Sequence, residues 1–208
     1  VDQRSELKWL YNRFPSLENF RLQIEEKSKN VPIENREILA KALLNQNQKF
    51  EISEATSTNI ELLKKSNTYT ITTGHQLNLF TGPLYFLYKI VSVINLTKQL
   101  KTAYPEHNFV PVYWMATEDH DFDEINFFNF KGKKIQWKKD SQGPVGRLNT
   151  SGLEEVFEQF SNELGLGNNA NYLRKLFKKS YLEHDNLADA TRYLANELFK
   201  NEGLVILD

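Results

Sequence analysis

The sequence contains no cysteine among its 208 residues. This absence excludes a disulfide framework, a thiolate metal site and a cysteine nucleophile within the chain. It fits a protein that is kept in a reducing compartment.

Long apolar runs and an excess of charge are also missing. The longest apolar stretch, residues 84–96, is interrupted by polar residues such as Lys89 and Asn95, whereas a membrane span needs about 20 mostly apolar residues. The N-terminus is charged from Asp2 onward, so we expect no signal peptide. The 26 basic and 27 acidic residues give a net charge of -1, which excludes a globally basic nucleic-acid binder. We expect neither a membrane nor a nucleic acid as a partner.

The length predicts one domain or two small ones. The chain starts at Val1 and stops at Asp208, directly after the apolar run 204–207. Both ends look cut, so we expect a fragment of a longer protein with an incomplete domain.

The order of predicted elements indicates an α/β fold with a parallel sheet. Apolar and β-branched runs predict strands at 68–73, 109–116 and 204–207, and a hairpin of 126–130 and 135–139 around the turn 131–134. Helical spacing predicts helices at 84–100, 151–164, 169–182 and 186–201, the second with a capping box of Ser151 and Glu154. We divide the chain into an N-terminal helical layer, 1–66, and a core, 67–208, with the hairpin and helices inserted around 125–183.

The first polar cluster follows the first predicted strand. Gly74 allows a sharp turn and a close ligand approach, and His75 and Gln76 add hydrogen-bonding groups, with His75 able to carry charge near neutral pH. Thr81, beside Gly82, could cap the next helix or bind an anion. The stretch is neither a Walker A loop nor a dinucleotide fingerprint. Taken alone, it is better explained as an ordinary strand-to-helix turn.

The second cluster, residues 118–124, places five carboxylates and one histidine after the second buried strand. It could bind a divalent cation, bind a substrate amine or sugar hydroxyls, or supply a general base. The acidic start of a short helix explains residues 121–124 well, but it explains residues 118–120, directly after a buried strand, less well. We favour function for Asp119 and His120 and a helix-end role for Asp123, and leave Glu118 and Asp121 open.

Three further residues have both a functional and a structural explanation. Arg147, in a glycine-rich loop, could form a bidentate anion fork. Trp114 lies close to the acidic strand end, although packing is its commoner use. Lys89 is best explained as a solvated side chain. The basic residues of the hairpin 131–139 are best explained as charges on a sheet edge that discourage pairing with another strand.

Several strings in this order resemble one family. They are 73–76 (TGHQ), 79–85 (LFTGPLY) with Tyr88 and Lys89, 111–116 (PVYWMA), 118–126 (EDHDFDEIN), 143–146 (GPVG) and 203–208 (GLVILD). Together they resemble the bacillithiol biosynthesis cysteine-adding enzymes, a family of cysteine ligases. The family usually has Gln where this chain has His75. The resemblance spans roughly residues 9–208 and implies a Rossmann-like fold, of which this chain is the N-terminal part.

The resemblance also implies an activity. Such enzymes join the carboxyl of cysteine to the amine of glucosaminyl-malate, giving bacillithiol in the cytoplasm, with carboxyl activation and the use of ATP left open. His75 and Gln76 would suit the malate carboxylates, the acidic strand end the amine and hydroxyls, and Asp119 or His120 would be the base. The full-length family member would be a homodimer with a coiled-coil domain.

Two other hypotheses stay open at this point. One is a metal-dependent hydrolase that uses Glu118, Asp119, His120 and Asp121. The other is a non-catalytic binding module with the acidic cluster as its docking face.

Overall fold

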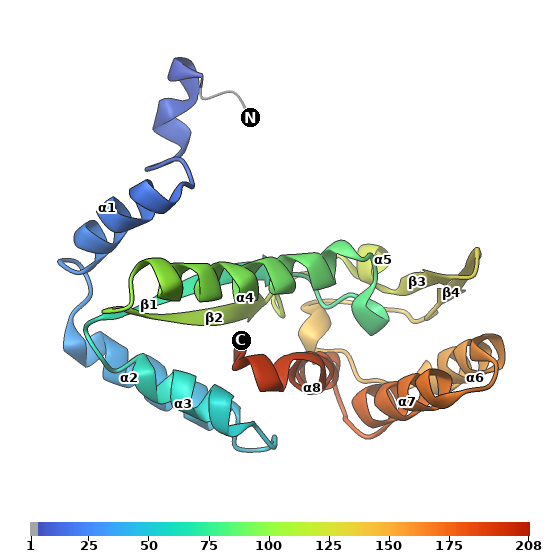
Figure 1. Cartoon of the computed structure of the whole chain (residues 1–208). Helices are drawn as coiled ribbons and strands as arrows, with labels where there is room; N and C mark the ends of the chain where they lie inside the picture. Colours follow the sequence, from blue (N-terminus) through green and yellow to red (C-terminus); the bar gives the residue numbers. More distant parts are fainter. Residues whose placement is uncertain (1–3) are drawn as a thin grey trace.

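A computed structural model describes residues 4–208 and contains a three-stranded parallel sheet (Figure 1). The strands are β1 (Thr68–His75), β2 (Asn108–Met115) and β5 (Val205–Leu207), in the order β1-β2-β5. Gly74 pairs with Trp114, and Trp114 with Leu207. All three strands therefore end at the same edge of the sheet, where ligands bind in open α/β folds.

Helices cover one face of the sheet because α4 and β2 bury their apolar side chains against each other. The helix α4 (Tyr85–Ala103) connects β1 to β2 and packs Phe86, Ile90 and Ile94 against Tyr113 and Met115. The helix α8 (Leu187–Phe199) contributes to the same core and is followed by a short 3-10 turn, Lys200–Glu202, that leads to β5.

The opposite face carries α2 (Ile33–Gln46) and α3 (Glu54–Leu62), which pack Ala40 and Ile60 against Val110 and Val112. The predicted α/β fold, a parallel sheet flanked by helices, is confirmed. The 3-10 helix Ser5–Leu10 and α1 (Leu17–Lys27) extend away from the sheet (Figure 1). Our division at residue 66 stays a prediction, and its residues 1–3 lie outside the described part.

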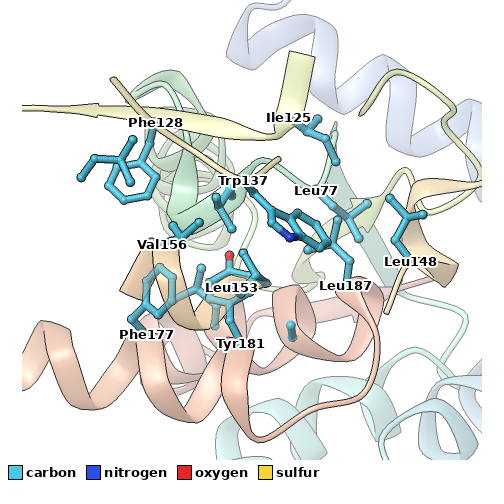
Figure 2. Close-up of a cluster of buried hydrophobic side chains, with 14 of the residues drawn as sticks. Leu77, Ile125, Phe128, Trp137, Leu148, Leu153, Val156, Phe177, Tyr181 and Leu187 are labelled. Carbon is cyan, nitrogen blue, oxygen red and sulfur yellow. The ribbon is translucent and has the colours of Figure 1, made fainter. Parts of the chain in front are cut away.

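The segment inserted between β2 and β5 builds a second core. It contains α5 (Phe122–Ile125), the hairpin β3 (Phe127–Phe130) and β4 (Lys133–Gln136), α6 (Leu153–Leu164), and α7 (Asn168–Phe177) with a π-helical turn, Lys178–Leu182. Trp137, Phe177 and Tyr181 lie at its centre together with Leu77 from the loop after β1 (Figure 2). The insertion is therefore packed against the same loop that follows the first strand.

Two local predictions were wrong. The hairpin turn is only Lys131 and Gly132, both at positive φ, so β4 starts at Lys133 rather than 135, as a tight two-residue turn requires. Ser151 does not cap α6, because its hydroxyl bonds to Asn149 and the helix is preceded by Gly152 at φ 88°. The predicted helices 169–182 and 186–201 are confirmed, and they change from α-helix to π-helix after Phe177 and to 3-10 helix after Phe199.

No helix between residues 4 and 208 combines the length and the apolar character that a membrane crossing requires.

Candidate functional site

The two polar clusters meet at the carboxyl edge of the sheet. His75 ends β1, and its register partner Met115 ends β2. The loops that follow therefore begin side by side, as the parallel strand order requires.

Gln76 joins the two loops directly. Its Nε2 donates to Asp119 Oδ2 at 2.8 Å and to Glu124 Oε2 at 2.9 Å. The other oxygen of Asp119 accepts from the backbone N–H groups of His120 (2.6 Å) and Asp121 (3.1 Å). One amide thus orders two carboxylates, of which Asp119 precedes the short helix α5 and Glu124 lies within it.

These hydrogen bonds fix the charge of Asp119. The bond from Gln76, followed by the two backbone N–H groups, lowers the pKa of Asp119 below its ordinary value, against a smaller opposing effect of burial. Asp119 is therefore a stable carboxylate at neutral pH. A general base works best with a pKa near the working pH, so the geometry favours an anionic binding role for Asp119.

A hollow of about 420 Å³ opens beside Gln76, and we call it the inner hollow. It is lined by Gly74, His75, Gln76, Tyr85, Lys89, Trp114 and Ala116. Lys89 Nζ donates to the carbonyl of Gly74 at 3.1 Å. This bond places a cation beside the carboxyl end of β1. The ring of Trp114 is 48% exposed and passes within 3.5 Å of the point that a Cβ on Gly74 would occupy.

His75 differs from our expectation of a charged group. Its side chain is buried against Tyr85 and Phe86, at ring-centroid distances of 5.0 and 5.4 Å, and its Nε2 has no hydrogen-bond partner. Burial, and then the positive charge of Lys89, lower the pKa of His75 to about 4. The imidazole is therefore neutral at pH 7 and contributes a hydrogen-bonding ring rather than a cation.

We expect the stability of the protein to fall as the pH drops from 6.5 to 4. In this window an unfolded His75 takes up a proton and the folded one does not, so the free energy of unfolding decreases. The full shift corresponds to roughly 3 kcal/mol, and because the ring borders an open hollow we expect about 1–2 kcal/mol after solvent screening. Urea titrations at several pH values measure this loss. His75→Gln should flatten the profile, and an unchanged profile in that variant would contradict the assignment.

A second cavity, the side groove, has a volume of about 880 Å³ and shares Gln76 and Tyr85 with the inner hollow. Its other lining residues are Asn78, Thr81, Gly82, Pro83, Leu84, Asp123, Glu124, Phe127, Phe128 and Asn129. Thr81 does not cap α4, since the residue before that helix is Leu84 and no side chain bonds to the helix start. Thr81 and Gly82 instead form part of the groove wall.

The remaining predicted residues lie outside both cavities. Glu118, His120 and Asp121 are exposed on the loop after β2 and Asp119 is half-buried there, and none of the four lines the inner hollow or the side groove. Arg147 is exposed as well, on a loop tied to this one by bonds from Val145 N–H to Asp119 O (2.7 Å) and from Gly146 N–H to Thr117 O (3.0 Å). We call the exposed residues Glu118, His120, Asp121 and Arg147 the rim, and they line neither cavity.

The structure adds site residues that sequence reasoning missed. Lys89, Tyr85, Asn78 and Glu124 all line the cavities, yet Lys89 has the same spacing as a solvated lysine and Glu124 the same position as a helix-end acid. The signal available in the sequence was their closeness to the two clusters. Among residues 4–208, no three His, Asp or Glu side chains come together in a way that could hold a metal ion.

Comparison with known proteins places this chain in a family. The family description "Bacillithiol biosynthesis BshC, N-terminal Rossmann-like domain" matches residues 1–208. The chain belongs to the BshC family. The expected resemblance and the Rossmann-like fold are thereby confirmed.

Relatives in the BshC family bear the name "Putative cysteine ligase BshC". One from Flavobacterium johnsoniae is 66% identical over 208 residues, which is 100% of this chain and 39% of the relative. One from Cytophaga hutchinsonii is 40% identical over 99% of the chain and 37% of the relative. One from Anoxybacillus flavithermus is 33% identical over 83% and 34%, respectively. The chain thus spans about 39% of the length of the BshC relatives that it matches over its whole length.

Proposed function

We propose that this chain carries the substrate-binding edge of a cysteine ligase that adds cysteine to glucosaminyl-malate in bacillithiol biosynthesis. The observation that carries the proposal is the match to the BshC domain over residues 1–208, with relatives named as cysteine ligases. The new bond would be an amide between the cysteine carboxyl and the sugar amine.

The charges around the two cavities support this assignment. Lys89 gives the inner hollow a cation, which attracts the carboxylates of the malate moiety, and neutral His75 can hydrogen-bond to them. Asp119 and Glu124 both accept a hydrogen bond from Gln76, so an amine bound there would lie near two carboxylates. Asn78, Thr81 and the backbone at Gly82 offer groups for sugar hydroxyls in the side groove, and Trp114 offers an apolar wall.

The reaction requires a neutral amine, because an ammonium ion has no free electron pair. Asp119, with its lowered pKa, holds the positively charged form and orients it. His120, the next residue and open to solvent, is our proposed base that removes the proton. Glu118, Asp121 and Arg147 on the rim stay predicted binding residues. A cytoplasmic location, a homodimeric whole protein and the absence of nucleic-acid partners stay predictions too.

Mass spectrometry tests the proposal on a protein of the relatives' full length that contains this chain. It is incubated with cysteine and glucosaminyl-malate, with and without ATP. We expect a product with the mass of the two substrates minus one water, and dependence on ATP would identify how the carboxyl is activated. N-acetylated glucosaminyl-malate, which lacks the free amine, is the matched control and should give none. No condensation product under any condition would overturn the proposal.

A further inference from the structure

Three consecutive residues after β1 have a left-handed backbone. Phe80, Thr81 and Gly82 have φ angles of 46°, 68° and 49°, and we call them the 80–82 turn. Glycine adopts this conformation readily, but it is disfavoured for an aromatic and a β-branched residue. Such strain persists only where the surrounding structure holds it in place.

The groups that hold the turn come from the inserted segment. The backbone N–H of Phe80 donates to Tyr181 Oη at 2.8 Å. The Phe80 ring packs against Phe160 and Phe177, at centroid distances of 4.8 and 5.1 Å. Tyr181 is itself fully buried in the π-helical turn Lys178–Leu182, and its hydroxyl lies inside the cluster shown in Figure 2.

The other side of the turn forms the side groove. Thr81 and Gly82 line that groove together with Asn78. The fit is tight, because a Cβ at Gly82 would lie only 2.5 Å from the Cβ of Asn78. Asn78 Nδ2 in turn donates to the backbone oxygen of Glu124 at 3.4 Å. A shift of the turn therefore changes the shape of the groove beside the carboxylates.

We propose that Tyr181 is a positioning residue for ligand binding in the side groove. Its hydroxyl oxygen holds the Phe80 N–H, which fixes the 80–82 turn and so the groove wall, although Tyr181 does not line the groove itself. The kinetic consequence rests on the proposed function, whereas the structural consequence does not.

Hydrogen exchange tests the structural consequence in the full-length protein. Tyr181→Phe keeps the buried ring and removes the acceptor, so the Phe80 amide should exchange about tenfold faster. Tyr193→Phe removes a hydroxyl from α8 that makes no hydrogen bond to the 80–82 turn, whose Phe80 N–H bonds to Tyr181, and is the matched control with unchanged exchange at Phe80. Unchanged exchange in Tyr181→Phe would overturn the proposal.

Kinetics test the consequence for binding. Tyr181→Phe should raise KM for glucosaminyl-malate by about tenfold and leave kcat within about twofold. Adding Thr81→Gly relieves the left-handed strain, so the double variant should come within about twofold of Thr81→Gly alone. A hydroxyl that only stabilises the fold would give the same loss with either residue at 81, and that result would overturn the proposal. If the wild-type protein forms no product, the proposed function fails, and the exchange experiment still decides the role of Tyr181.

Discussion

Replacing Asp119 with Asn is expected to reduce kcat/KM for product formation by about 100-fold while the protein stays folded. One Asp119 oxygen accepts two backbone N–H groups and the other accepts Gln76 Nε2. An Asn side chain must turn its NH₂ group toward one of these donors in either orientation, and it carries no charge to hold an ammonium ion. Loss of one partner of a close charged pair costs about 2–5 kcal/mol, which covers the expected change.

Asp140→Asn is the matched control for this experiment. Asp140 is an exposed carboxylate after the hairpin, away from both cavities, and its replacement should leave the rate unchanged. The measurement is the initial rate of condensation-product formation by mass spectrometry, with circular dichroism to verify folding. A wild-type rate in Asp119→Asn would remove Asp119 from the site.

Gly146→Ala is expected to destabilise the fold by about 3 kcal/mol or more. An added Cβ would lie 2.6 Å from Thr117 Cβ and 2.9 Å from the Thr117 backbone oxygen, and backbone cannot move aside as a flexible side chain can. Overpacking of this kind typically costs 1–3 kcal/mol and occasionally more. For a chain of this size the melting temperature should fall by roughly 6–12 °C.

Gly74→Ala provides the comparison, since it adds the same methyl group at the same edge of the sheet. There the nearest atom outside the neighbouring residues would be 3.5 Å away, on the ring of Trp114, which is an ordinary contact. Thermal melts of both variants decide the matter. Equal melting temperatures would show that the loop with Thr117 and the loop with Gly146 separate easily. That result would contradict the close approach of the two residues.

The sequence predicts the strands well and the cavities poorly, for physical reasons. A run such as 109–116 is continuously apolar and therefore identifies a strand buried on both faces. Lys89 falls on a helix whose period explains it without a ligand, and only the bond to the carbonyl of Gly74 shows where it lies. The charge of His75 depends on burial against Phe86, which no local pattern reveals.

The 80–82 turn is the clearest case of a feature that could not be predicted. Phe80 and Thr81 favour extended backbone by their local preference, and they are held left-handed by Tyr181, a residue far along the chain. Tertiary packing overrides the local preference here. By contrast, the pairing of Gln76 with Asp119 follows from the parallel order of β1 and β2, which the sequence does predict.

The distance along the chain between the turn and its anchor also has a consequence for synthesis on the ribosome. The residues around Gln76, Asp119 and Glu124 belong to one continuous stretch, 74–124, and can meet as soon as the chain from β1 to α5 has emerged. Tyr181 is translated later, by roughly 3–11 s at typical elongation rates. Until α6 and α7 have been translated, the aromatic ring of Phe80 lacks its partners Phe160 and Phe177. We therefore expect a nascent chain stalled before residue 153 to have a paired β1 and β2 but an unformed groove wall.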